Sequence, residues 1–288
     1  MKITNKYGLP KAFENFFNET MYTPKEKRYS ATTLLKPTQQ IILEKRYNKE
    51  LEQDVSEMVW LLFGTAVHDM LEKYDETGNA ELYFNTPIIE DYLLSGKVDL
   101  YDEENGVLTD YKTASVNKVL FKNFDDWYKQ GMIYAYLLKM NGKDVKKVQF
   151  HALLKDWSQA TLKRKVMNRE EYPKTAIFTY DFMVSDKEMN EIEIFIKEKF
   201  DELVANESFD DGNLTECSNE EKWNSGDTYA VKKRGVKKAK RVFKNEQDAI
   251  EFLTKGHYIE KRNGVNKKCD LYCPVRDHCK QYKREKGE

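Results

Sequence analysis

The chain lacks a long apolar run. No stretch of its 288 residues approaches the ~20 apolar residues that a membrane span needs, and its first residues contain no signal-peptide core. A Gly-x-x-x-x-Gly-Lys phosphate loop is also missing, which argues against an ATP-driven motor. We therefore expect a soluble cytoplasmic protein that uses neither a membrane nor ATP.

Cysteine is scarce, and its four copies all lie in the last quarter of the chain, at Cys217, Cys269, Cys273 and Cys279. An even number of cysteines in a secreted chain would suggest disulfides. Because no secretion signal precedes them, clustered cysteines are better interpreted as ligands of a metal ion or a cluster.

The net charge of −1 hides an uneven distribution of charge. Residues 231–288 hold 18 Lys/Arg against 8 Asp/Glu, whereas the rest of the chain holds 30 against 41. Charged residues make up 34% of the chain, but aromatic residues at 13% still supply material for a core. An acidic body with a basic tail fits an enzyme that binds a polyanion, and plain solvated charge fits as well.

One stretch, residues 96–112, has the pattern of a β-hairpin. Short apolar alternations flank an acidic turn that ends in Asn105-Gly106, a strong turn signal. Asp99 lies on the first strand, and Asp110 and Lys112 share one face of the second because side chains alternate. Two carboxylates and an ammonium group suit a hard divalent cation and a phosphate, although each residue taken alone also fits a solvated strand face.

The remaining periodicity predicts a mixed sheet flanked by helices, an α/β or α+β core that ends near residue 205. The expected helices cover 54–74, 125–140 and 185–205, and the expected strands cover 82–113, 145–154 and 176–184. The first helix carries Gly64, His68 and Glu72 at a spacing of four. Gly64 suggests close approach by another backbone. His68 taken alone fits a structural residue, and Glu72 fits a partner of His68, a ligand of a second metal ion, or a plain surface residue.

Three regions follow from this organisation. Residues 1–29 form an N-terminal arm, either a docked helix or a loose segment. Residues 30–205 form the core, and residues 206–288 form a basic, cysteine-rich module.

The ordered motifs Gly64-x-x-x-His68, Gly96-x-x-Asp99, Asp110-x-Lys112 and Gln130-x-x-x-Tyr134 resemble the RecB-like branch of the PD-(D/E)xK nucleases. Phage exonucleases and CRISPR-associated RecB-like exonucleases of that branch are the most similar types. The resemblance implies a restriction-endonuclease-like α/β core. It also implies that the protein acts in a bacterial cell or a phage-infected host. An Asp-x-Lys motif alone would not indicate this family.

The resemblance also implies roles for single residues. His68, Asp99, Asp110 and the main-chain carbonyl of Tyr111 would ligate Mg²⁺ or Mn²⁺. Lys112 would orient or help to deprotonate the attacking water, because a cation beside the reacting phosphate offsets its growing negative charge. Further along the chain, Gln130 and Tyr134 would face the substrate backbone or hold Lys112 in place.

The four cysteines resemble the iron–sulfur module of the same branch, which implies a [4Fe–4S] cluster. Bound zinc and thiols without any metal are the two alternatives. Two features depart from the family pattern. Three residues separate Cys269 from Cys273 where the family usually has two, and Cys217 follows the core instead of preceding it. A cluster here would fold the tail on itself and hold its basic segment against DNA. The DNA-binding residues expected there are Lys232, Lys233, Arg234, Lys237 and Lys238.

The resulting hypothesis is a metal-dependent DNA exonuclease that acts on ends or single strands in recombination, repair or phage DNA processing. Recombination or replication proteins are candidate partners. The alternatives are an endonuclease of the same superfamily, a catalytically silent nucleic-acid-binding protein, and a zinc-ribbon-like interaction module fused to an inert core. The sequence leaves polarity of digestion, DNA against RNA, and oligomeric state open.

Overall fold

The structure is a computed structural model that describes residues 1–20, 26–74 and 80–288. The chain divides into two compact units. The first contains residues 1–36 and 48–208, and the second contains residues 37–47 and 209–288. Within the described ranges, no helix has both the length and the apolar character to cross a membrane.

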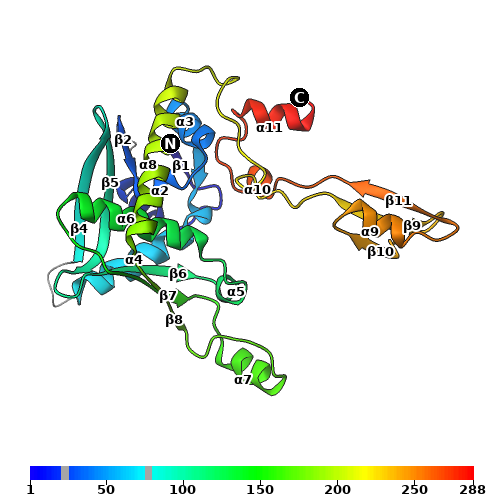
Figure 1. The fold of residues 1–288 in the computed structure, drawn as a ribbon, viewed down its shortest axis with the longest axis horizontal. Helices are drawn as coiled ribbons and strands as arrows, with labels where there is room; N and C mark the ends of the chain where they lie inside the picture. The colour runs from blue at the N-terminus through cyan, green and yellow to red at the C-terminus, as the bar shows by residue number, and fades with distance from the viewer. Residues whose placement is uncertain (21–25, 75–79) are drawn as a thin grey trace. The chain divides into compact units, whose positions relative to one another are not determined.

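The first unit is built on a mixed six-stranded sheet (Figure 1). Its strands run in the order β2-β5-β6-β7-β8, and β4 also pairs with β5. The pairs β2–β5 and β6–β7 are parallel and the others are antiparallel. The strands are β2 (Arg28–Ser30), β4 (Ala80–Ile89), β5 (Tyr92–Asp102), β6 (Val107–Ala114), β7 (Lys147–Leu154) and β8 (Ile177–Met183). The α/β class expected from the sequence is confirmed.

Two long helices pack beside this sheet. Helix α6 (Asp125–Met140) is buried along most of its length, and the missing side chain of Gly131 lets it approach Val148 and Phe150 of β7. Helix α8 (Asp186–Glu207) packs on α6 and begins with a capping box, in which Ser185 and Glu188 bond each other's backbone. Both helices therefore begin and end close to their predicted limits.

The N-terminal residues dock on the first unit as a helix. Strand β1 (Lys2–Thr4) pairs in parallel with β3 (Glu52–Asp54), and helix α1 (Lys11–Thr20) follows it. Phe17 of α1 is fully buried with Val55 and Met58. Of the two alternatives for this segment, the docked helix is the one found.

The helix expected from residue 54 starts later than predicted. Helix α4 spans Val59–Lys73, and a short 3₁₀ turn, Val55–Glu57, precedes it. Asp54 ends β3 instead, because its carboxylate accepts hydrogen bonds from Ser56, from the main-chain N–H of Lys6 and from the Thr4 hydroxyl. Such a side chain stabilises a turn and delays the helix.

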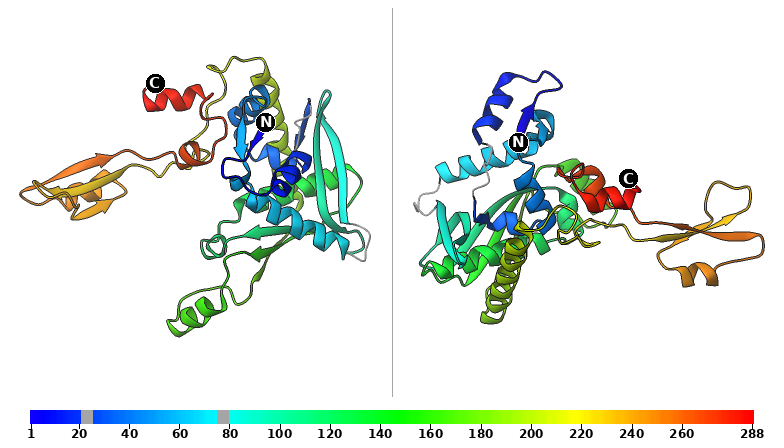
Figure 2. Two further views of the ribbon diagram at one scale, coloured as in Figure 1. Left: turned by 180° about the vertical axis from the view of Figure 1, so that it is seen from behind. Right: turned by 90° about the horizontal axis from the view of Figure 1, so that it is seen from above.

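Three shorter helices complete the first unit. Ser30 caps α2 (Ala31–Leu34) by accepting the N–H of Thr33. Helix α5 (Val116–Leu120) follows β6. Helix α7 (Gln159–Met167) was not among the predicted helices, and it lies at the far end of the β7–β8 pair (Figures 1 and 2).

The second unit combines the tail with one helix from the N-terminal part of the chain. Helix α3 (Thr38–Arg46), which the sequence analysis placed in the core, groups with residues 209–288. Arg46 forms an ion pair with Asp211 at 2.6 Å, and the ring of Tyr47 stacks on His278 with 3.9 Å between centroids. The unit is therefore not formed by the tail alone.

The tail itself contains a small antiparallel sheet that was not predicted from the sequence, and helix α9 (Glu246–Glu251) packs against it (Figure 2). Strand β9 lies between β10 and β11. The elements are β9 (Thr228–Lys233), β10 (Arg241–Phe243), α9 (Glu246–Glu251), β11 (His257–Arg262), α10 (Lys267–Leu271) and α11 (Lys280–Lys286). This sheet separates the first cysteine from the last three along the chain.

Candidate active site

The predicted hairpin is present, and its two strands separate (the hairpin splays) just before Asp99 and Asp110. Strands β5 and β6 pair from Asp102↔Val107 to Leu100↔Thr109. At the next position the Asp99 carboxylate accepts the main-chain N–H of Tyr111, with 2.7 Å between Oδ2 and N. A side chain thus takes the hydrogen bond that a neighbouring strand would otherwise supply.

The other oxygen of Asp99 faces His68. The imidazole Nδ1 lies 3.2 Å from Asp99 Oδ1, and both side chains are mostly buried. The hydrogen bond that His68 donates to the Asp99 carboxylate raises the pKa of His68 above its usual value, against the opposite effect of burial. His68 reaches this position from α4, so two distant segments meet here.

Asp110 and Lys112 form the second pair of the site. Their spacing of two puts both on one face of β6, and Lys112 Nζ lies 2.5 Å from Asp110 Oδ2. Burial raises the pKa of Asp110 and repulsion by Asp99 adds to this, while Lys112 opposes both. The Oδ2 atom is buried and has no hydrogen bond of good geometry despite its ion pair, so it retains capacity for a ligand.

Gln130 and Tyr134 lie behind Asp110 and are both buried. They share one face of α6, and Gln130 Nε2 lies 3.4 Å from Asp110 Oδ1 and 3.3 Å from the Tyr134 hydroxyl. Burial raises the pKa of Tyr134. The amide thus reaches Asp110, whereas the sequence analysis expected it to face the substrate or to hold Lys112.

The two glycines of the motifs differ in what they require. A Cβ on Gly96 would lie 2.7 Å from Cε1 of Tyr134, so the absence of a side chain makes room for that ring. A Cβ on Gly64 would meet only the Thr113 hydroxyl, at an ordinary 3.7 Å. The close backbone approach expected at Gly64 is therefore wrong. Glu72, one turn beyond His68, is exposed.

Phe150 is a supporting residue that sequence reasoning missed. It is fully buried on β7 opposite Asp110, and Lys112 Nζ lies 5.7 Å from the centroid of its ring. A cation over an aromatic face is attracted by it, so the ring helps to place the ammonium group. In the sequence, Phe150 belongs to an alternation of apolar residues along β7. That alternation predicts a core position, but it does not distinguish Phe150 from the other core residues of the strand.

The side chains do not converge as a ready metal site. Within the described ranges, no three His, Cys, Asp or Glu side chains form a group that could hold a metal ion. His68 is paired with Asp99 and Asp110 with Lys112 instead. The donor set still fits a divalent cation, because two carboxylates and an imidazole are suitable ligands and one buried carboxylate oxygen lacks a hydrogen bond.

In the second unit all four cysteines line one small cavity, together with Gln39 of α3. None of the four thiols forms a disulfide. Gln39 is almost fully buried, and its Oε1 lies 3.6 Å from Cys217 Sγ and 3.3 Å from Cys279 Sγ. The structure thus gathers the four predicted sulfur ligands around one space, without placing any three at ligating positions.

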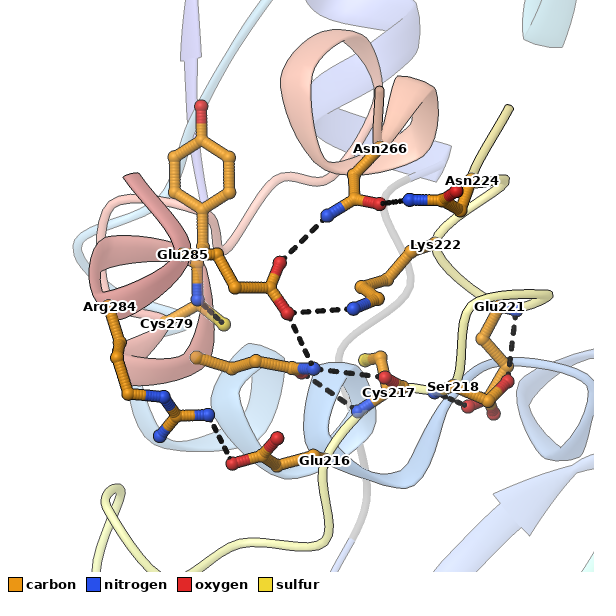
Figure 3. A network of polar contacts seen from close by, with 12 residues as sticks. Glu216, Cys217, Ser218, Glu221, Lys222, Asn224, Asn266, Cys279, Arg284 and Glu285 are labelled. Atoms are coloured by element: carbon orange, nitrogen blue, oxygen red, sulfur yellow. Dashed lines mark hydrogen bonds and ion pairs between the residues drawn. The ribbon is translucent and has the colours of Figure 1, made fainter. Parts of the chain in front are cut away.

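A polar network holds the cysteine-bearing segments together (Figure 3). The Gln281 side chain bonds both the N–H and the carbonyl of Cys217, at 2.9 and 3.0 Å. Glu285 lies between Lys222 and Asn266 and bonds both at 2.7 Å. These bonds tie the segment around Cys217 to α11 and to the start of α10.

The thiols are neutral by environment. Burial raises the pKa of Cys217 to about 12 and that of Cys269 to about 11, and the neighbouring cysteines add to both shifts. It also raises the pKa of Cys273 and of Cys279. Buried thiols with raised pKa values lack the thiolate character of a reactive cysteine, and a bound metal cation would reverse this balance by favouring thiolates.

The basic run expected to bind DNA lies at the end of β9 and in the loop that follows it. Lys232 Nζ already forms an ion pair with Glu260 at 2.9 Å. The other members are exposed, namely Lys233, Arg234, Lys237 and Lys238. Lys232 is thus the member least available to a phosphate.

Comparison with known proteins gives a family. Residues 79–280 match the model of the PD-(D/E)XK nuclease superfamily. No curated protein matched the chain. Similar solved structures include SSO0001 (16% identity, 66% of this chain and 82% of that one, TM-score 0.45) and the alkaline exonuclease LHK-Exo from Laribacter hongkongensis (14%, 67% and 93%, TM-score 0.39). Another is a phage-related exonuclease from Haemophilus somnus 129PT (14%, 68% and 82%, TM-score 0.26).

The family match covers both strands of the hairpin, the helix behind it and most of the tail. It extends over more than half of the chain. The protein therefore belongs to the PD-(D/E)XK nuclease superfamily.

Proposed function

We propose that this protein is a metal-dependent DNA exonuclease that hydrolyses phosphodiester bonds at DNA ends or on single strands. One observation carries the proposal: the splayed hairpin brings Asp99 next to His68 and Asp110 next to Lys112. Superfamily membership supports nuclease chemistry. The choice of an exonuclease rests on the resemblance of the ordered motifs, as does a role in recombination, repair or phage DNA processing.

Asp99, Asp110, His68 and the carbonyl of Tyr111 would hold Mg²⁺ or Mn²⁺. The bound ion would supply Lewis acidity and lower the pKa of a water molecule. An imidazole is a softer ligand than Mg²⁺ prefers, which favours Mn²⁺ in this set. Binding requires a neutral His68 and an ionised Asp110, so both of the pKa shifts described above make protons compete with the metal.

Lys112 acts on the reacting phosphate. Its side chain is 20% exposed, whereas that of Asp110 is 4% exposed, so the ammonium group lies on the open side of the pair. It orients the attacking water and offsets the negative charge that develops on the phosphate oxygens. Gln130 holds the Asp110 carboxylate from behind, and Tyr134 supports the Gln130 amide.

The decisive assay uses anaerobically purified protein, Mn²⁺ or Mg²⁺, end-labelled single- and double-stranded DNA, and a covalently closed circle. We expect digestion of a linear substrate while the circle survives. Asp110→Ala should be inactive, and Glu104→Ala, an exposed carboxylate in the same hairpin, should be active. Cleavage of the circle would instead identify an endonuclease, and binding without hydrolysis would identify a silent nucleic-acid-binding protein.

We further propose that the four cysteines hold a [4Fe–4S] cluster, with zinc as the alternative. Their shared cavity and the network around Glu285 support a structural metal centre. Anaerobically purified protein should be brown, and Cys273→Ser should lose the colour and destabilise the tail. Colourless protein that contains zinc would overturn the iron assignment and support the zinc alternative.

The exposed basic residues after β9 are proposed to contact the DNA backbone. Charge reversal at Arg234, Lys237 and Lys238 should weaken DNA binding and flatten its dependence on salt, because each lost phosphate contact lowers the salt slope. Lys232→Ala should have a smaller effect, since Glu260 already neutralises that ammonium group. Unchanged affinity and salt slope after the reversal would identify the run as solvated surface.

A further inference from the structure

Helix α4 exposes more apolar surface than a core helix would. None of its fifteen residues is buried, although its sequence is largely apolar. Trp60 is 58% exposed and Leu61 is 55% exposed. Large exposed apolar side chains that form a contiguous patch mark a binding surface in soluble proteins.

Trp60 lies on the part of α4 that continues from the candidate active site. Trp60, Gly64 and His68 follow one another at a spacing of four, which keeps them on one face of the helix. His68 meets Asp99, and Gly64 faces Thr113 near the end of β6. Eight residues at the helical rise put Trp60 about 12 Å from His68 along the axis.

A cation covers the exposed indole. Lys155 Nζ lies 3.8 Å from the centroid of the Trp60 ring. Lys155 directly follows β7, and its main-chain N–H bonds the carbonyl of Ala114 at 2.9 Å, which fixes it at the same end of β6. The indole of Trp60 and the ammonium group of Lys155 therefore lie together near the end of β6, which continues past Lys112 to Ala114.

We propose that Trp60 is a stacking platform for a base of the substrate strand, with Lys155 contacting an adjacent phosphate. The inference rests on the proposed nuclease function, because the occupant is the single strand that passes the catalytic pairs. Aromatic faces stack any base, and a neighbouring cation neutralises the backbone, which suits an enzyme that does not read sequence. When a base covers the indole, Lys155 exchanges the ring for a phosphate oxygen.

The test measures binding of labelled oligo(dT) to full-length Asp110→Asn protein, which does not cleave its ligand. Adding Trp60→Ala should raise the dissociation constant roughly 5- to 150-fold, the value of one stacked base. Trp60→Phe should recover most of this loss, because a phenyl ring also stacks. Leu61→Ala is the matched control from the same exposed helix and should bind as the parent does.

Two further readouts separate stacking from a general loss of structure. Oligo(dT) should quench tryptophan fluorescence of the parent, and Trp60→Phe should abolish most of that quenching. Lys155→Ala should reduce the slope of log affinity against log salt by about 0.7, one phosphate contact on a single strand. Circular dichroism should give the same folded signal for every variant.

The outcomes also separate this inference from the proposed function. If the active protein degrades DNA but Trp60→Ala binds oligo(dT) as tightly as its parent, the platform is refuted and the nuclease stands. If the protein with Mn²⁺ neither binds nor degrades DNA, the proposed function itself fails. If the protein forms a dimer that Trp60→Ala dissociates and DNA affinity is unchanged, the surface binds a second copy and the platform is refuted.

Discussion

Asp99 bonds two segments at once, because its Oδ2 accepts the N–H of Tyr111 at 2.7 Å while its Oδ1 lies 3.2 Å from His68 Nδ1. One carboxylate thereby joins strand β6 to helix α4 at the point where the hairpin splays. This arrangement explains why a residue on the first strand can act together with residues from two other elements. It also means that a substitution at Asp99 changes position as well as charge.

Substitutions of Lys112 and of Asp110 should have different effects on metal binding. Asp110→Ala should lose both Mn²⁺ binding and cleavage, because it removes a proposed ligand. Lys112→Ala should retain Mn²⁺ binding but reduce single-turnover cleavage by about 10²- to 10³-fold, the usual effect of removing one stabilising group. Isothermal titration with Mn²⁺ and quenched-flow assays measure the two quantities. Full cleavage by either variant would refute the assignment.

Gly96→Ala should disturb the site through packing. The new methyl group would lie 2.7 Å from the Tyr134 ring, and overpacking of this kind typically costs about 1–3 kcal/mol. Gly64→Ala is the matched comparison, because its methyl group meets nothing closer than 3.7 Å and alanine favours a helix. Chemical denaturation should therefore show a loss of stability for the first and none for the second. Equal stabilities would contradict the contact between Gly96 and Tyr134.

Asp54→Asn should make the protein less sensitive to acid. The hydrogen bond from the Lys6 backbone is the largest contribution that lowers the pKa of Asp54, and bonds from Ser56 and Thr4 add to it. The stabilisation is present above the unfolded value of about 3.9 and is lost as the pH falls through the lower folded value. The difference in free energy of unfolding between wild type and variant should shrink as the pH falls below 4. Glu57→Gln, an exposed neighbour, should show no such change.

Gln39→Ala should loosen the metal centre proposed for the cysteines. Gln39 contacts the sulfur atoms of both Cys217 and Cys279, and loss of an outer partner of a metal ligand typically costs 10- to 100-fold in affinity. A chelator should therefore remove the metal faster from this variant, as followed by absorbance. Gln40→Ala is the control, since Gln40 lines the same cavity but bonds Glu44. Equal rates for the two variants would assign Gln39 to packing alone.

Local rules predicted much of the first unit. The Asn105-Gly106 turn and the limits of α6 and α8 depend on neighbouring residues, and these features formed close to where they were expected. The start of α4 did not, because Asp54 bonds residues near the N-terminus that are about fifty positions away. A contact over such a separation leaves no periodic signal.

The candidate site shows the same limit. Alternation along a strand predicted that Asp110 and Lys112 share a face, and their ion pair follows from it. The partner of Gln130 was not predictable in this way, since the distance from α6 to β6 depends on Gly131 and Phe150. The exposure of Trp60 was equally hidden, because an apolar helix is usually interpreted as part of a core.

The place of α3 affects how the protein can be made and shortened. Residues 37–47 leave a ribosome long before Phe209 does, yet Gln39, Arg46 and Tyr47 contact Cys217, Asp211 and His278 of their own unit, all of which follow Ser208. The second unit therefore completes its fold only after synthesis of almost the whole chain. A recombinant fragment that stops at Ser208 would leave helix α3 without the residues that it packs against. To produce an isolated nuclease core, residues 37–47 must therefore be redesigned in addition to removing the tail.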